Sequence, residues 1–226
     1  MSKVQRQIRT ACVAGCIMAF VIATGAQEPT NGPPRTDNAK KANARPVDPG
    51  VEKPEPFADA SVEKMAASCV SLETELGVIE IEMIPEVAPE SVRGFLNLAA
   101  TGALDTTTFS RTVKDFVIQG GNLTTSEKWG NELARRMSRK LPDEPGLVKH
   151  VRGIVSMART DEANSATTHF FILVGDGHHL DGKFSAFGRV TKGIEVADEI
   201  NKAPAEGEKP NKPVRINRAI ATPCKR

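Results

Sequence analysis

An arginine and a glutamine stand among aromatic and aliphatic residues in segment 109–122 of this 226-residue chain. The segment reads as two short extended runs, broken near residue 114 and closed by a Gly-Gly pair. Strand alternation places Arg111 and Gln119 on faces that they share with apolar side chains. Pointing inward, such polar groups are costly unless they are paired. Pointing outward, they are ordinary surface residues, so the segment alone leaves both interpretations open.

The histidines and cysteines give little reason to expect a metal ion. The four cysteines form no Cys-x-x-Cys pair, and no Cys/His spacing resembles a zinc site. His178 and His179 lie near Asp176 and Asp181, but adjacent residues in a loop seldom both point at one ion. We therefore expect no metal and no cofactor. The net charge of +2 gives no reason to expect a nucleic-acid partner.

The first 26 residues have the pattern of an export signal. Three basic residues precede an uncharged apolar run over residues 11–24, which is short for a bilayer span, and small residues end it. Two alternatives remain open. The segment could be an uncleaved membrane anchor, or Cys16 in Val13-Ala14-Gly15-Cys16 could be lipidated. After signal cleavage we expect no integral membrane domain.

Residues 27–66 are predicted to form a disordered, proline-rich linker. Seven prolines fall between Pro29 and Pro56, and Phe57 is the one aromatic residue. Such a segment buries too little apolar surface to offset its ordering entropy. Seven of the nine phenylalanines lie between Phe95 and Phe187, which indicates a single folded domain over residues 67–226.

Two amphipathic helices are predicted in that domain. Residues 90–101 place apolar side chains at spacings of three, four and seven, and Gly102 marks the helix end. Residues 193–200 give the second helix. The long polar segment 123–149 is expected to be a surface loop with at most a short helix around residues 133–138.

Eight further runs are typical of strands: residues 69–74, 77–84, 109–113, 116–119, 153–158, 168–174, 183–190 and 213–221. Many short strands at regular spacing favour a mostly β fold in which an eight-stranded antiparallel barrel closes on itself. The two helices would cap this closed barrel.

Four ordered segments of this chain resemble the cyclophilin family. They are Phe109-Ser-Arg111 with Phe116-Val-Ile-Gln-Gly-Gly121, then Ile154-Val-Ser-Met-Ala-Arg159, then Asn164-Ser-Ala-Thr-Thr-His-Phe-Phe-Ile172, and last Leu180-Asp-Gly-Lys183 with Phe187-Gly-Arg-Val190. The resemblance covers roughly residues 68–222. The run from Met157 to Thr160 looks more like bacterial cyclophilins than animal ones.

The resemblance implies peptidyl-prolyl cis-trans isomerase activity on a cyclophilin-like barrel. Carried over by position, Arg111 is the catalytic arginine and Gln119 positions the substrate backbone. The remaining positions imply a proline pocket, a backbone platform for the peptide, and a rim. The pocket consists of Phe116, Val117, Phe171 and Leu180, the platform of Ala158 and Arg159, and the rim of His179 and Phe184.

Amide rotation accounts for these residue types. Resonance gives the X–Pro bond partial double-bond character and a barrier of about 18–20 kcal/mol. A donor aimed at the prolyl nitrogen stabilises the lone pair that appears when the amide twists. Arg111 suits this task because its guanidinium stays protonated and its donors form a rigid fork.

Four positions depart from the family pattern, and His169 is the most consequential. The family usually has glutamine at position 169, and a charged imidazole would repel Arg111. At the other three positions this chain has Phe184 in place of a pocket histidine of the family, Val117 in place of a longer methionine, and His179 in place of a tryptophan.

The resemblance also implies a disulfide between Cys69 and Cys224. In the resembled barrel the first and last strands pair antiparallel, which brings the start of one beside the end of the other. The expected partners are proline-containing unfolded or extended chains, and the expected state is a monomer in the periplasm or cell envelope. Two other roles stay open: a proline-peptide-binding module or chaperone with little turnover, and a structural component of an envelope assembly.

Overall fold

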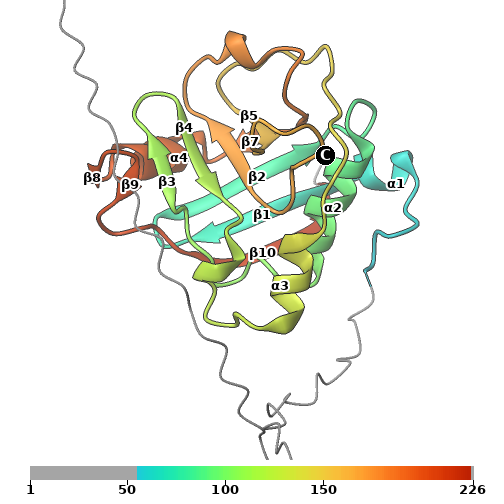
Figure 1. Ribbon diagram of the computed structural model, residues 1–226, viewed down its shortest axis with the longest axis horizontal. Helices are drawn as coiled ribbons and strands as arrows, with labels where there is room; N and C mark the ends of the chain where they lie inside the picture. Colours follow the sequence, from blue (N-terminus) through green and yellow to red (C-terminus); the bar gives the residue numbers. More distant parts are fainter. Residues whose placement is uncertain (1–54, 225–226) are drawn as a thin grey trace, which may run out of the picture. The chain divides into compact units, whose positions relative to one another are not determined.

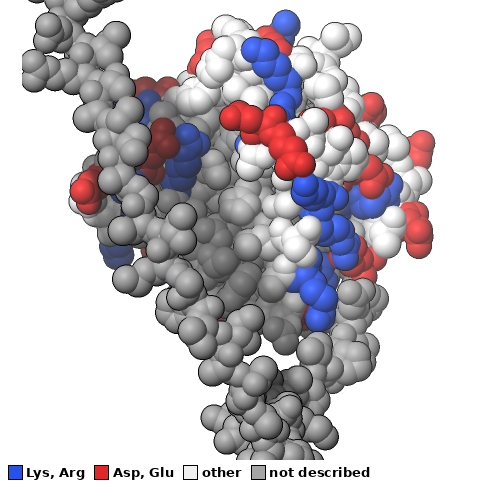
Figure 2. Space-filling view, viewed as in Figure 1, with Lys and Arg blue, Asp and Glu red and all other residues white. Residues whose placement is uncertain are grey.

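The computed structural model describes residues 55–224. The predicted signal segment and residues 27–54 of the predicted linker lie outside this range. None of the helices in this range has the length and the apolar composition that a membrane span requires. On the face in Figure 2, several lysine and arginine side chains form a short band, and aspartate and glutamate side chains border it.

An eight-stranded antiparallel sheet forms the body of the domain (Figure 1). Its strands follow the spatial order β10-β1-β2-β7-β5-β6-β4-β3. Their bounds are β1 Ser68–Thr74, β2 Gly77–Met83, β3 Arg111–Val113, β4 Val117–Gly120, β5 Ile154–Met157, β6 Phe170–Leu173, β7 Ala186–Lys192 and β10 Ile216–Pro223. Each predicted strand is therefore present, with ends that differ by up to a few residues.

The prediction of a closed barrel is wrong, because β10 and β3 are the two ends of the strand order. The segments before them are joined by an isolated bridge between Thr108 and Arg215 and by a few backbone hydrogen bonds beside it, not by a continuous strand ladder. The outer edge of β3 is occupied by another element, since the Thr112 N–H donates to the carbonyl of Glu208 at 2.8 Å. Glu208 lies in the turn of a separate hairpin formed by β8 Ala205–Glu206 and β9 Lys209–Pro210. The sheet is thus an open, strongly curled half-barrel.

Both predicted helices are confirmed, as α2 Pro89–Ala100 and α4 Ile194–Lys202. Pro89 suits the first turn of α2, where its missing N–H has no intrahelical partner. The short helix in the polar loop is α3 Asn131–Ser138, and a further short helix, α1 Val62–Ala66, was not predicted. The described residues therefore hold four α-helices where the barrel prediction had two. Two 3-10 turns, η1 Leu123–Thr125 and η2 His178–Leu180, complete the element order.

Phenylalanine rings form the centre of the core. The Phe95 ring lies 5.0 Å from both Phe170 and Phe187, and Phe109 lies 6.2 Å from Phe170. All four rings are almost fully buried. Each such aromatic pair contributes roughly 0.5–1.5 kcal/mol beyond the area it buries. The clustering of phenylalanines in the sequence thus correctly located the core.

The disulfide between Cys69 and Cys224 is present, with the two Cα atoms 4.9 Å apart. The antiparallel register of β1 and β10 brings it about, because it sets Cys69 opposite Thr222, two residues before Cys224. The backbone N–H of Cys224 also donates to the carbonyl of Ala67. This cross-link fixes the β10 edge of the open sheet.

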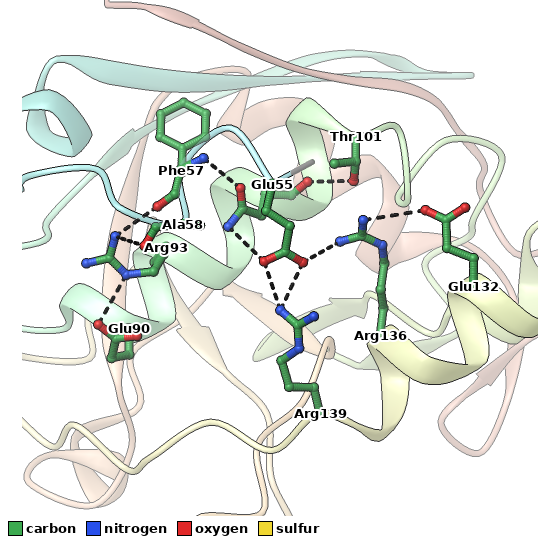
Figure 3. A network of polar contacts seen from close by, with 10 residues as sticks. Glu55, Phe57, Ala58, Glu90, Arg93, Thr101, Glu132, Arg136 and Arg139 are labelled. Carbon is green, nitrogen blue, oxygen red and sulfur yellow. Dashed lines mark hydrogen bonds and ion pairs between the residues drawn. The ribbon is translucent and has the colours of Figure 1, made fainter. Parts of the chain in front are cut away.

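Residues 55–66, which we expected to belong to the linker, pack against α2 and α3 (Figure 3). Phe57 and Met65 are buried in the main core. One nitrogen of Arg93 donates to the carbonyls of residues 57, 58 and 60 at 2.8–3.0 Å. The average composition of residues 27–66 did not indicate this packing. Two buried apolar side chains and a few hydrogen bonds are enough to order a short segment within it.

Glu55 begins this N-terminal arm, which we define as residues 55–60, and binds two arginines of the α3 region (Figure 3). Its carboxylate lies 2.8 Å from Arg136 and 2.8 Å from Arg139. The Arg136 side chain is only 8% exposed, and its Nε atom has no acceptor within the described part of the chain. The arm thereby fastens α3 to the domain.

Candidate active site

The β3–β4 hairpin sets Arg111 directly opposite Gln119. The two side chains meet, with Nη1 of Arg111 donating to Oε1 of Gln119 at 3.1 Å. Nε of Arg111 donates to a carboxylate oxygen of Glu208 at 2.7 Å. The sequence left open whether Arg111 and Gln119 point inward or outward. In the structure the two side chains are paired, and both border a pocket.

Backbone crowding requires a glycine directly after β4, at the second position of the Gly-Gly pair. Gly121 has a φ of +83°, and a Cβ there would lie 2.1 Å from the carbonyl oxygen of Thr168. The hydroxyl of Thr168 donates to the Gly121 carbonyl at 2.8 Å. This close approach seats the end of β4 against the segment that carries His169.

Asn201 of α4 holds the turn between β3 and β4. Its side-chain oxygen accepts from the N–H of Asp115, and its amide nitrogen donates to the carbonyls of Val113 and Val117. Asp115 has a φ of +58°, a conformation that residues other than glycine adopt infrequently. The buried asparagine therefore supports the hairpin that presents Arg111.

The pocket beside this hairpin has a volume of about 720 Å³. Ten of the eleven site residues expected from the sequence line it: Arg111, Phe116, Val117, Gln119, Ala158, Arg159, His169, Phe171, Leu180 and Phe184. Its floor belongs to a small apolar cluster that includes Val117, Phe171 and Leu180. Segments more than 70 residues apart in the sequence thus converge on one cavity.

His179, the eleventh, is not among the lining residues. Its ring packs against the outer side of the pocket on Phe116, with centroids 5.3 Å apart. The 3-10 turn η2, which contains both residues, directs Leu180 inward instead, and Leu180 is buried.

Two platform residues behave differently from the expectation. The N–H of Ala158 donates to the carbonyl of His169 at 2.9 Å, so this donor is not available to a peptide. The guanidinium of Arg159 stacks 4.9 Å above the Phe184 ring and donates to the carbonyls of Thr160 and Lys183. Arg159 thus contributes its side chain, and not only its backbone, to the pocket wall.

His169 lines the pocket as a partly buried residue. Burial lowers the pKa of its imidazole from the usual value, because the charged form loses hydration. The neutral ring therefore predominates near pH 7, and the repulsion of Arg111 that the sequence raised does not arise there.

His150 contacts Asp181, the residue that follows the pocket-lining Leu180. The backbone N–H of His150 donates to the Asp181 carboxylate at 2.8 Å, and ring atom Nδ1 lies 3.2 Å from the same carboxylate. Ring atom Nε2 lies 3.3 Å from the hydroxyl of Ser156. Burial lowers the pKa of His150. The hydrogen bond from the His150 backbone N–H is the main cause that lowers the pKa of Asp181 to about 2. These contacts fix the loop that carries Leu180.

Four lining residues were missed by the sequence: Met137, Thr160, Ser165 and Thr167. Met137 follows Leu133 by four positions on an otherwise polar helix, and that spacing could have indicated an inward face. The three hydroxyl residues lie in irregular loops without a periodic signal. Within residues 55–224, no group of three or more His, Cys, Asp or Glu side chains could hold a metal ion.

The family model for cyclophilin type peptidyl-prolyl cis-trans isomerases matches residues 69–221. The chain belongs to the cyclophilin family. It is an isomerase.

Relatives of this cyclophilin occur in eukaryotes and bacteria. It is 36% identical over 159 residues to peptidyl-prolyl cis-trans isomerase cypE of Dictyostelium discoideum, covering 70% of this chain and 99% of that protein. It is 37% identical over 160 residues to peptidyl-prolyl cis-trans isomerase A of Dickeya dadantii, with coverage of 66% and 82%.

A solved structure shares the fold. The crystal structure of a Cryptosporidium parvum cyclophilin type peptidyl-prolyl cis-trans isomerase in the presence of the dipeptide Ala-Pro superposes with a TM-score of 0.60. The two sequences are 29% identical, and the match covers 67% of this chain and 97% of the other.

Proposed function

We propose that the pocket beside Arg111 binds a proline and its neighbours in an extended chain and catalyses rotation about the X–Pro bond. One observation carries this proposal: the Arg111–Gln119 pair borders an apolar pocket of about 720 Å³. The related Cryptosporidium protein was crystallised in the presence of Ala-Pro, a ligand of the same chemistry.

Each part of the pocket has a task in this reaction. Phe116, Phe171 and Leu180 hold the proline ring and exclude water, which strengthens the interaction of a charged donor with the twisted amide. Arg111 donates to the prolyl nitrogen as its lone pair leaves conjugation. No bond breaks and no proton is exchanged, so the reaction needs neither a general acid nor a general base.

Arg111 accounts for only part of the acceleration. A hydrogen bond from a charged group contributes about 1.5–3 kcal/mol, which corresponds to about 10- to 100-fold in rate. Shape and desolvation in the apolar pocket supply the rest. If the pocket supplies the rest of the acceleration, Arg111→Ala should keep measurable peptide binding.

An isomerisation assay on a short X–Pro peptide tests the proposal. We expect catalysed cis-trans exchange by residues 55–226, lost to a large extent in Arg111→Ala. Binding of the peptide without acceleration of exchange would instead favour a proline-peptide-binding module. His169 makes that second function worth testing, because it stands where the family usually has glutamine.

We further propose that the enzyme acts on exported chains outside the cytoplasm. The export-like pattern of residues 1–26 supports this, as does the Cys69–Cys224 disulfide, because disulfides persist mainly in oxidising compartments. Fractionation of cells that carry the full chain, compared with a variant lacking residues 2–26, tests it. Equal amounts of both proteins in the cytoplasm would contradict it.

A further inference from the structure

A carboxylate from a distant part of the sequence contacts the guanidinium that the reaction uses. Glu208 lies 97 positions after Arg111, yet its Oε2 atom accepts from Nε of Arg111 at 2.7 Å. Glu208 belongs to the short β8–β9 hairpin, which lies after the last of the four motif segments quoted for the family resemblance.

The hairpin holds this carboxylate in place. The carbonyl of Glu208 accepts from the N–H of Thr112, the residue next to Arg111, at 2.8 Å. Gly207 precedes it with a φ of +60°, the left-handed conformation that glycine adopts without strain. The backbone of the turn is therefore fixed to β3, and the side chain of Glu208 reaches Arg111 over a short path.

The guanidinium consequently has two of its three nitrogens engaged. Nε donates to Glu208 and Nη1 donates to Gln119. Nη2 has no acceptor among residues 55–224 and carries two N–H groups. Because the guanidinium is planar and both Nε and Nη1 are held, its orientation is fixed, and Nη2 points in a defined direction.

We propose that Glu208 is a positioning residue for catalysis, which fixes the Arg111 guanidinium so that Nη2 is presented to the prolyl nitrogen. The long arginine side chain would otherwise sample several rotamers and would lose that freedom in each catalytic cycle. This inference rests on the proposed role of Arg111.

Glu208 also sets the charge that a peptide meets. Its carboxylate offsets the positive charge of Arg111 at the pocket border, so acidic peptides gain little from that charge. Removing the carboxylate leaves the arginine uncompensated, and peptides with Asp or Glu before proline should then improve relative to neutral ones, most at low ionic strength.

Folding should be little affected by changes at position 208. The Arg111–Glu208 ion pair is well exposed, with side chains 41% and 56% exposed, and exposed pairs contribute little to stability. Activity can therefore be measured on a folded enzyme.

The test measures kcat and KM on neutral and acidic X–Pro peptides for Glu208→Ala and Glu208→Gln, with Glu206→Gln as the matched control on the same hairpin. We expect Glu208→Ala to lower kcat about two- to five-fold with little change in KM for the neutral peptide. Glu208→Gln keeps an acceptor and should recover part of this loss. The control should match the unchanged enzyme.

A double variant shows whether Glu208 acts through Arg111. In an Arg111→Ala background, Glu208→Ala should have no further effect on kcat. Equal losses in both backgrounds, or an unchanged kcat in Glu208→Ala at low salt, would overturn the inference. Full activity in Arg111→Ala would instead refute the proposed role of Arg111 itself, so the two failures are distinguishable.

Discussion

The side-chain oxygen of Asn201 accepts a hydrogen bond from the backbone N–H of Asp115 at 2.8 Å. This contact joins the last turns of α4 to the turn of the β3–β4 hairpin. The same side chain donates to two carbonyls of that hairpin, so one buried amide satisfies three backbone groups. The catalytic strand pair thus depends on a helix that reaches it from more than 80 residues away.

Asn201→Ala should lower both stability and activity. The change leaves buried backbone groups without partners, at a cost of about 1–3 kcal/mol in the free energy of unfolding. Asn201→Asp should not restore stability, because a carboxylate cannot donate to the two carbonyls. Urea unfolding measures the loss, and Asn217→Ala, on the exposed face of β10, provides the control. Equal stability of Asn201→Ala and the control would contradict this account.

Glu55 is predicted to stabilise the domain although it lies in the proline-rich region. Among residues 55–224, Glu55→Gln leaves the buried Arg136 cation with only Glu132, at 3.4 Å, as a charged partner. We expect a loss of about 1–3 kcal/mol in the free energy of unfolding. Glu132→Gln should cost less than about 0.5 kcal/mol, since it removes a long i,i+4 contact whose carboxylate is 38% exposed. If both variants unfold at the same urea concentration, the N-terminal arm does not fasten α3.

His150 and Asp181 should make stability depend on pH in two windows. Burial lowers the folded-state pKa of His150 below its usual value near 6.5, so the unfolded chain takes up a proton first. Its contribution is full above about pH 6.5 and is lost as the pH falls toward the folded-state pKa. The pKa of Asp181 is lowered from 3.8 to about 2, so its contribution is lost over that more acidic range.

Unfolding curves at several pH values measure this dependence. The stability of the unchanged protein should fall between pH 7.5 and 5, and the fall should be shallower in His150→Gln, which cannot titrate. A protein that becomes more stable across this range, or identical slopes in both proteins, would show that His150 is not held neutral.

Activity should be insensitive to pH until His169 becomes charged. Burial lowers the pKa of His169, so any fall in kcat/KM should have its midpoint below about 6.5, where a second positive charge would oppose Arg111. The same fall should be absent in His169→Gln. A bell-shaped profile that persists in His169→Gln would indicate acid–base chemistry in place of amide rotation.

The sequence predicted the individual strands and helices better than it predicted whether the sheet closes into a barrel. Alternation and the Gly-Gly pair located β3 and β4, and the phenylalanines located the core, because these signals are local. Whether β10 meets β3 depends on the β8–β9 hairpin, whose two-residue strands carry no periodic signal. The four-segment resemblance identified ten lining residues, but it could not reveal Glu208 or Asn201. Their partners lie 97 and 86 positions away, and each residue reads as ordinary surface composition.

The contribution of Arg111 to catalysis is the most direct test of the whole account. The measurement is kcat/KM on a neutral X–Pro peptide for Arg111→Ala and Arg111→Lys, together with peptide affinity by NMR titration. We expect a fall of at least about 10- to 100-fold in Arg111→Ala, a smaller loss of affinity, and no rescue by lysine, whose ammonium lacks the planar fork. Full activity of Arg111→Ala would contradict the account and would require a different centre of chemistry in this domain.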